Sequence, residues 1–322
     1  MNEDQLAKES SDSALSTDEN KNEKNIASLA NRIFIIWLIA TQGILWFSYF
    51  LQIPSSLIES ASGIFLRRIL MLPVAVIMGC YLLRIRPKMM LYSEVKAPSL
   101  LAIDKFLLTI SCLAPKFVIL FLINPLFEKF ALPPILPFQN NVFDSILIEI
   151  TTCVVAPIVE EILCRGIFLR STQKYGTMFA IVSSALVFAA WHGGIRIFHS
   201  FIGGLLYGIL FVKTGSIIWP ILLHILYNSM NSLSDAIKNS VVFPFGDNGI
   251  YFICIVLGCI CFFCYAFRQH LAIQNFSLAN VKKLGEKLKA DKRNYFQYFT
   301  SAGMLLLLLI YIASFFDFSV IK

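Results

Sequence analysis

The 322-residue sequence contains few charged residues. Asp, Glu, Lys and Arg together make up 15% of the chain, against roughly 25% in a typical soluble domain. Hydrophobic residues make up 57%, and the mean hydropathy is +0.72. This shortage of charge excludes an ordinary soluble domain. It predicts an all-α fold, namely a polytopic bundle of transmembrane helices.

The sequence also lacks a nucleic-acid-binding signature and a disulfide framework. The formal net charge is +7, but the Lys and Arg residues lie in short loops between apolar runs, where they indicate membrane orientation. Most of the eight cysteines lie inside apolar segments, where cysteine behaves as a small hydrophobic residue. Cys261 and Cys264 form a CxxC pair, but no histidine or second cysteine pair is near them, so we expect no metal there.

The first 28 residues contain few apolar groups and charges of both signs. This composition predicts a disordered polar tail on the cytoplasmic side of the membrane. The tail has no basic region followed by a short apolar core, as a cleavable signal peptide would. We therefore expect the first apolar run to act as the membrane signal and to remain in the bilayer.

Apolar runs of about 20 residues predict eight or nine membrane spans. The candidate ranges are 29–53, 64–83, 106–127, 143–169, 177–193, 198–213, 217–235, 250–267 and 300–319. Basic residues collect between the second and third spans and between the eighth and ninth, so both loops should be cytoplasmic. Nine spans with a cytoplasmic N-terminus satisfy this distribution and predict a multi-pass integral membrane protein, in the cell membrane if the source is bacterial.

The chain accordingly divides into four parts. They are the polar tail 1–28, N-terminal helices 29–142, a core 143–235, and C-terminal helices with a basic cytoplasmic loop 236–322. Basic residues alternate with apolar ones over residues 268–297. This pattern is typical of an amphipathic helix at the membrane surface, and a solvated linker is an equal alternative.

The stretch VVAPIVEEILCRGIF, residues 154–168, has the composition of a membrane helix but contains Glu160, Glu161 and Arg165. An ionisable side chain at the bilayer centre costs about 3 kcal/mol or more, and it indicates a functional site with a partner group. Glu161 and Arg165 are four residues apart, so they lie on one helix face and can form an ion pair. Glu160 points about 100° away and needs a partner from another helix.

Two of the four histidines, His192 and His224, lie in or at the ends of predicted spans. Glu160 and His192 are equally far along the chain from the middle of a predicted cytoplasmic turn, so they should lie at one level. Counted from the predicted cytoplasmic ends of their spans, Glu160 and His224 are both about 13 Å deep. Asn228 follows His224 by one helical turn. The sequence thus predicts a polar layer near the cytoplasmic third of the membrane.

Three motifs, EEILCR, FAAWH and HILYN, occur in this order inside the predicted spans. They resemble the EExxxR, FxxxH and HxxxN motifs of the CPBP intramembrane protease family, which includes the type II CAAX prenyl proteases and the bacterial Abi and bacteriocin-immunity proteins. The run FIGGLLYGILFVKTGS also resembles the glycine-containing helix and Thr-Gly-Ser turn of that family. The resemblance covers about residues 143–235.

The resemblance implies an intramembrane endopeptidase that hydrolyses peptide bonds of membrane-associated proteins or peptides. Glu160 would be the catalytic acid and base, acting with His192 to hold and deprotonate a water molecule. His224 and Asn228 would stabilise the oxyanion of the tetrahedral intermediate. Their neighbours on the Glu160 helix would be supporting residues, forming the internal ion pair Glu161–Arg165.

Metal dependence has two versions. In the favoured version the enzyme is a glutamic protease that needs no cofactor, because the sequence has no HExxH helix. In the alternative it is an intramembrane metalloprotease, because one glutamate and two histidines can also form an open zinc site. Zinc would then bind to Glu160, His192 and His224.

Two other classes of protein remain as alternatives. A transporter or proton-relay protein also places carboxylates and histidines in the membrane, although the polar groups here collect at one depth instead of crossing the bilayer. A catalytically inactive scaffold or immunity protein could bind a partner in the same cavity. The expected partners are the lipid bilayer and a peptide or membrane-tethered substrate, prenylated or not, with no nucleic acid.

Two further features within the predicted spans have structural interpretations. Lys116 is expected to extend toward the membrane surface or to pair with Glu149. The Gly203-Gly204 pair is expected to mark a close approach between helices.

Overall fold

The structure is a computed structural model that describes residues 25–94, 99–129, 141–192, 196–237, 249–269 and 292–315. Helices make up nearly all the regular structure of these residues, and the only extended pairing among them is an isolated bridge between Tyr92 and Ser216. The predicted all-α membrane bundle is confirmed at this level. The tail 1–24, most of the basic loop at 270–291 and the end of the last span lie outside the described residues.

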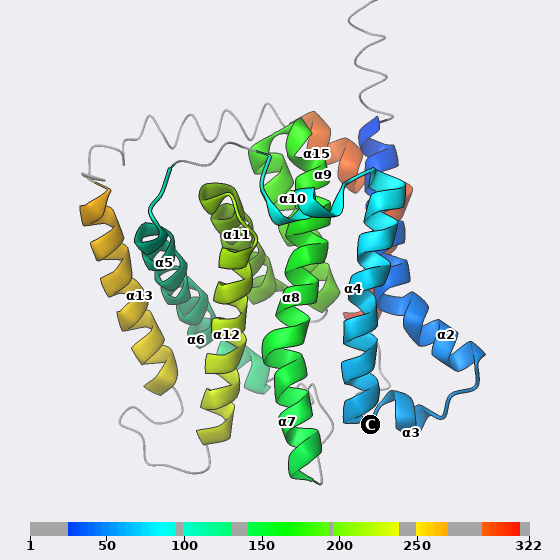
Figure 1. Ribbon diagram of the computed structural model, residues 1–322, viewed down its shortest axis with the longest axis horizontal. Helices are drawn as coiled ribbons and strands as arrows, with labels where there is room; N and C mark the ends of the chain where they lie inside the picture. Colours follow the sequence, from blue (N-terminus) through cyan, green and yellow to red (C-terminus); the bar gives the residue numbers. More distant parts are fainter. Residues whose placement is uncertain are drawn as a thin grey trace, which may run out of the picture.

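The helices follow one another along the chain as a series of antiparallel and crossing segments (Figure 1). The first span, Asn25–Phe50, contains the π turn η1 (Ile39–Gly43) and α2 (Ile44–Phe50). The N-terminal part continues with α3 (Ser55–Ile58), α4 (Ala61–Leu83), the 3₁₀ turn η2 (Pro87–Leu91), α5 (Ala102–Ser111) and α6 (Leu113–Lys129). The later helices are α10 (Thr177–His192), α11 (Ile197–Thr214), α12 (Ile218–Ile237), α13 (Gly249–Arg268), α15 (Lys292–Phe299) and α16 (Ala302–Phe315).

Each of the nine predicted spans overlaps a helix, and six helices in the described part of the chain are long and apolar enough to cross a membrane. Two bounds were wrong. The predicted span 106–127 begins earlier, at Ala102, and is interrupted at Cys112 between α5 and α6. The predicted span 143–169 continues to Tyr175. Helix α10 has 16 residues, which corresponds to about 24 Å, and it is shorter than the other core helices.

The longest helix, Val142–Tyr175, is continuous but not uniform. It consists of α7 (Val142–Ile150), the π turn η3 (Thr151–Val155), α8 (Ala156–Glu161), the π turn η4 (Ile162–Leu169), α9 (Arg170–Thr172) and the 3₁₀ turn η5 (Gln173–Tyr175). Turns of π type are rare and often occur at functional sites. Here they lie on both sides of the two adjacent glutamates.

Small residues set the distance between α10 and α11. A Cβ atom added to Gly204 would lie 2.9 Å from both Cα and Cβ of Ala185 on α10. The backbones of the two helices therefore approach at this point, as predicted for the glycine pair. Helix α12 packs on α11, and α5 and α6 pack on α13.

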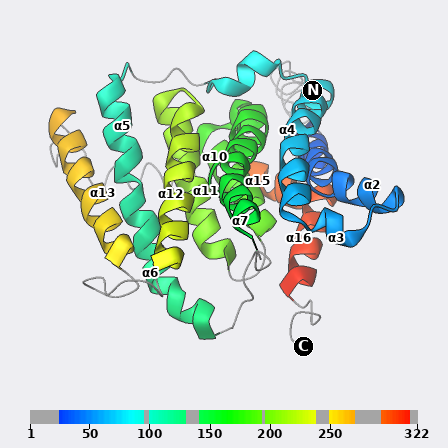
Figure 2. The same ribbon diagram turned by 60° about the horizontal axis from the view of Figure 1, so that its bottom comes forward.

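Figure 2 shows the result as a row of helices with α13, α5 and α12 toward one side and α4 toward the other. Helix α4 packs on the Val142–Tyr175 helix. The glutamates of α8 consequently lie inside the bundle, with helices from the first half of the chain on either side of the core. This arrangement brings side chains of α4 and α6 near a site that the sequence placed in residues 143–235.

Candidate active site

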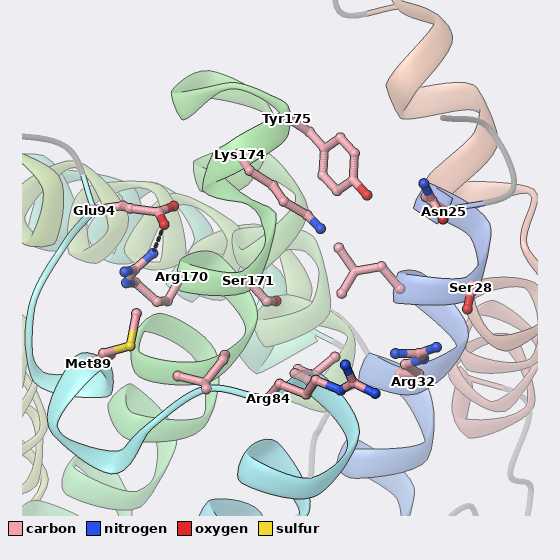
Figure 3. Close-up of a pocket in the computed structure, with 13 residues that line it drawn as sticks. Asn25, Ser28, Arg32, Arg84, Met89, Glu94, Arg170, Ser171, Lys174 and Tyr175 are labelled. Carbon is pink, nitrogen blue, oxygen red and sulfur yellow. Dashed lines mark ion pairs between the residues drawn. The ribbon is translucent and has the colours of Figure 1, made fainter. Parts of the chain in front are cut away.

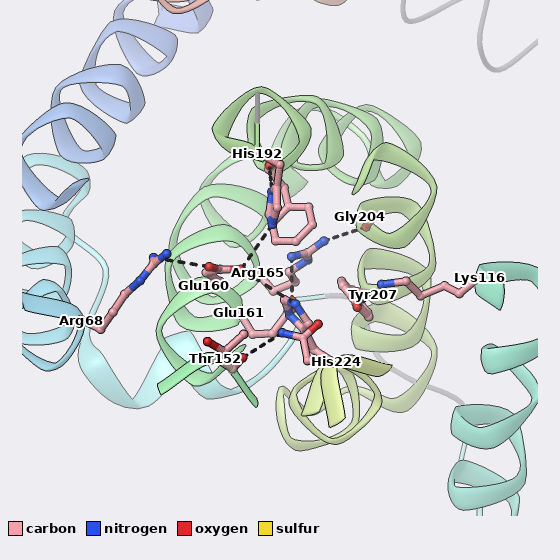
Figure 4. Close-up of polar contacts among 12 residues, drawn as sticks. Arg68, Lys116, Thr152, Glu160, Glu161, Arg165, His192, Gly204, Tyr207 and His224 are labelled. Atoms are coloured by element: carbon pink, nitrogen blue, oxygen red, sulfur yellow. Dashed lines mark hydrogen bonds and ion pairs between the residues drawn. The ribbon is translucent and has the colours of Figure 1, made fainter. Parts of the chain in front are cut away.

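The two glutamates of α8 are both buried, with 5% of Glu160 and none of Glu161 exposed. They are neighbours on an α-helix, so their side chains point about 100° apart. The two carboxylates consequently have different partners, which Figure 4 shows. We describe the Glu161 side first, because its contacts determine the orientation of one histidine.

Glu161 and Arg165 form an ion pair with 3.0 Å between Oε1 and Nη1, as the four-residue spacing predicted. The guanidinium of Arg165 also donates to the carbonyl oxygen of Gly204 at 2.8 Å. Neither side chain of the ion pair is exposed. Oε1 of Glu161 also accepts a hydrogen bond from Nδ1 of His224 at 2.9 Å. The ion pair therefore joins α8, α11 and α12 in the interior.

Glu160 faces the two predicted histidines. Its Oε2 atom lies 3.9 Å from Nε2 of His192 and 3.9 Å from Nε2 of His224. The other carboxylate oxygen, Oε1, lies 3.5 Å from Nη1 of Arg68 on α4. The depth count thus predicted a real convergence, since residues 160, 192 and 224 meet within the bundle. The roles of these residues in a reaction stay predictions.

The other ring nitrogen of each histidine has a partner that fixes its hydrogen. Nδ1 of His192 lies 2.9 Å from the carbonyl oxygen of Phe188. A carbonyl oxygen only accepts, so Nδ1 of His192 is the donor. Nδ1 of His224 donates in the same way to the Glu161 carboxylate. In the neutral form of each ring, the lone pair of Nε2 then faces Glu160.

Three acceptor atoms thus point at one small volume, because an ionised Glu160 also only accepts. Such a group is stable only if a donor or a cation lies between its members. A water molecule, an additional proton on one ring, or a divalent metal ion can supply this link. The same arrangement of a histidine whose second nitrogen donates to a carbonyl or carboxylate is typical of metal-binding histidines.

The donor set therefore suits zinc by its chemistry, but the distances are wide. Two ligands of a tetrahedral zinc ion, each roughly 2.0–2.1 Å from the metal, lie about 3.3 Å from each other. The nitrogen–oxygen distances here are 3.9 Å. In the described part of the chain, no three His, Cys, Asp or Glu side chains meet closely enough to hold a metal ion.

Asn228 lies one turn beyond His224 on α12, as predicted. Its Nδ2 atom donates to the carbonyl oxygen of Thr152 at 3.0 Å. Thr152 belongs to the π turn η3. This bond orients the amide and occupies one of its two hydrogens, so the second hydrogen is available to another acceptor.

Two cations near the site were missed by the sequence analysis. Arg68 contacts Glu160, and its guanidinium lies 5.7 Å from the ring centre of Trp191. Lys116, on α6, lies nearly flat against aromatic rings, 3.4 Å from the ring centre of Tyr227 and 4.4 Å from that of Tyr207. An arginine inside the predicted span 64–83 was the available signal, because charge within a span indicates function.

The expectation for Lys116 was wrong. Its side chain is buried, with 4% of the residue exposed, and it donates to the hydroxyl of Tyr207 instead of reaching the surface. Glu149 instead accepts a hydrogen bond from Ser232 at 2.6 Å. The Tyr207 ring stacks on His224, with 4.6 Å between ring centres. Lys116 therefore belongs to the surroundings of His224.

These features define a helical integral membrane protein with a buried cluster of glutamates and histidines. Residues 142–230 match the family model described as type II CAAX prenyl endopeptidase Rce1-like. The match confirms, for this segment, the resemblance that the motifs predicted. It contains all six predicted site residues, whereas Arg68 and Lys116 lie outside it. Comparison with curated proteins and with solved structures gives no match.

Proposed function

We propose that this protein is an intramembrane endopeptidase that hydrolyses peptide bonds with a water molecule activated by Glu160 and His192. One observation carries the proposal: two histidine Nε2 atoms lie at equal distances, 3.9 Å, from the same carboxylate oxygen. A water molecule in this gap can donate one hydrogen to Glu160 and the other to Nε2 of His192. Its oxygen is then free to attack a carbonyl carbon.

In this mechanism Glu160 takes a proton from the attacking water. The water oxygen forms a bond to the scissile carbonyl carbon, and the carbonyl oxygen becomes an oxyanion. Glu160 then returns the proton to the nitrogen of the leaving amine as the carbon–nitrogen bond breaks. A single carboxylate thus serves as general base and general acid, a role that contributes about 10²–10⁴-fold to the rate of a typical enzyme.

His224 and Asn228 would stabilise the oxyanion. His224 can donate from Nε2 only when that nitrogen also carries a hydrogen, which makes the ring an imidazolium. The Glu161 carboxylate, 2.9 Å from Nδ1, favours this charged form. The free amide hydrogen of Asn228 is the second donor. Removal of one such donor typically costs about 3 kcal/mol.

A metal-dependent form of the same activity uses the same residues. Glu160, His192 and His224 would hold a zinc ion, which would polarise the scissile carbonyl group or the water. We favour the metal-free form, because the sequence has no HExxH helix. The substrate is a peptide or a membrane-tethered protein, and the experiment below includes prenylated and unmodified peptides.

The test is cleavage by the full-length protein, purified and reconstituted in liposomes, of a library of lipidated and unmodified peptides, followed by mass spectrometry. We expect cleavage by the wild type and a loss of at least about 10²-fold in Glu160→Gln. Glu149→Gln is the matched control, because it makes the same chemical change on the same long helix and should stay active. A metal chelator distinguishes the two forms.

The two alternative classes predict other outcomes. An inactive scaffold would cleave nothing yet bind a peptide, and a proton-relay protein would acidify or alkalise the liposome lumen. Either result with folded wild-type protein would contradict the proposal.

A further inference from the structure

A pocket of about 380 Å³ lies at the end of the bundle that is predicted to be cytoplasmic. This basic pocket is lined by the start of the first span, by the segment after α4 and by the end of the Val142–Tyr175 helix (Figure 3). Its lining residues are Asn25, Ser28, Leu29, Arg32, Leu83, Arg84, Ile85, Met89, Glu94, Arg170, Ser171, Lys174 and Tyr175. None of them belongs to the candidate active site.

The charge of the pocket is strongly one-sided. Its lining includes four cationic side chains, those of Arg32, Arg84, Arg170 and Lys174, and a single carboxylate, that of Glu94. In Figure 3 Arg32 comes from the first span on one side, and Lys174 comes from the end of the long helix on another. Like charges repel one another, so this convergence favours an anion between them.

The carboxylate is already occupied. Glu94 pairs with Arg170 at 2.7 Å between Oε1 and Nη1, which leaves the other three cations without an acidic side chain in the pocket. The Arg170 side chain is nine-tenths buried, and its Nε atom has no hydrogen-bond partner among the described residues. A buried donor without a partner is costly, and a ligand oxygen would remove this cost.

The wall that contains Glu94 is fixed by hydrogen bonds. The backbone nitrogen of Glu94 donates to Oε1 of Gln173 at 2.8 Å, and Nε2 of Gln173 donates to the hydroxyl of Ser93 at 2.9 Å. The backbone nitrogen of Ser93 also donates to the carbonyl oxygen of Gly215 at 3.2 Å. The segment after η2 is therefore tied to two separate turns of the bundle, so the pocket exists before any ligand binds.

We propose that this basic pocket binds a phosphate group, supplied by the headgroup of an anionic phospholipid. Several arginines with nearby hydroxyls, here Ser28 and Ser171, suit phosphate oxygens. Basic pockets between transmembrane helices on the cytoplasmic side are typical sites for such headgroups. Ile35 lies three residues after Arg32 and is 41% exposed, so an acyl chain can follow the same helix toward the membrane interior. A soluble phosphate ester shares this chemistry.

The test measures lipid binding to the full chain in a neutral detergent by native mass spectrometry. The probes are phosphatidylglycerol, phosphatidylcholine with the same acyl chains, and glycerol phosphate. We expect one phosphatidylglycerol to bind at least about tenfold more tightly than phosphatidylcholine. Arg84→Gln/Lys174→Gln should abolish this preference. Both side chains are exposed, and thermal unfolding in the same detergent checks that the variant is folded.

The matched control is Arg86→Gln/Lys88→Gln. It removes two charges from the same end of the molecule, next to Arg84 in the chain, but neither residue lines the pocket. It should keep the preference for phosphatidylglycerol within about twofold. If glycerol phosphate binds as tightly as the lipid, the phosphate site stands and its source is soluble. Equal binding of both lipids without phosphate binding, or equal losses in both double variants, would overturn the proposal. The readout is independent of proteolysis.

Discussion

The segment 142–230 and the helices that precede it contribute to the site in different ways. The segment supplies the two glutamates, both histidines and Asn228, and its fully buried ion pair Glu161–Arg165 has a 3.0 Å separation. The preceding helices supply cations at the edge. Arg68 is 3.5 Å from Glu160, and 30% of its side chain is exposed. The groups that could react thus come from one contiguous part of the chain, and other helices set the charge around them.

The sharpest test of this comparison lies inside the segment. Glu160→Gln and His192→Ala should each reduce the cleavage rate by about 10²–10⁴-fold, because both act on the same water. The double variant should be no slower than the slower single variant, since residues that act as a unit are not additive. Rates are measured on the best peptide of the library. Losses that multiply in the double variant would show that the two side chains act in separate steps.

Arg165 should affect stability most. Arg165→Met leaves Glu161 buried without its guanidinium partner, and such a change typically costs about 3–5 kcal/mol in the free energy of unfolding. Thermal unfolding in detergent measures the loss. Glu161→Gln/Arg165→Met removes both charges and should recover much of the stability but not the activity, because His224 loses its carboxylate. An Arg165→Met protein that is inactive yet as stable as the wild type would place Arg165 in the reaction itself.

Lys116 tests the preceding helices at a buried position. Lys116→Met leaves the Tyr207 hydroxyl without its donor, and we expect a loss of about 1–3 kcal/mol in the free energy of unfolding. Lys116→Met/Tyr207→Phe removes both polar groups and should lie closer to the wild type. Denaturant titration of the three variants measures both values. A double variant less stable than either single would mean that Lys116 stabilises the fold through its contact with the Tyr227 ring.

Arg68 should give the smallest effect, since a partly exposed ion pair is worth about 1 kcal/mol or less. We expect Arg68→Gln to change kcat/KM by no more than about fivefold and to leave the unfolding temperature nearly constant. Arg67→Gln is the control, because it removes the same charge from the neighbouring position of α4. A loss as large as that of Glu160→Gln would move Arg68 from the edge of the site into its centre and would end the distinction between the two regions.

The parts of the site that could be predicted are those that depend on local helix geometry. Glu161 and Arg165 pair because four residues make about one turn, and Glu160 and His192 meet because they are equally distant from one turn of the chain. Arg68 and Lys116 depend on how separate helices cross, and no spacing within the sequence encodes such a crossing. The π turns were missed for a related reason, because a helix with one extra residue keeps the same apolar composition.

The π turn η4 has a consequence for insertions and deletions. It lies between Glu160 and Arg170, the residues with which the long helix contributes to the active site and to the basic pocket. A π turn contains about one residue more than an α turn, so the helix can lose one residue here and close into regular α form. Such a deletion would keep the glutamates in place and rotate everything beyond them by about 100°. Shortened relatives could thus retain the EExxxR glutamates while losing the pocket, so the two sites can be gained and lost separately.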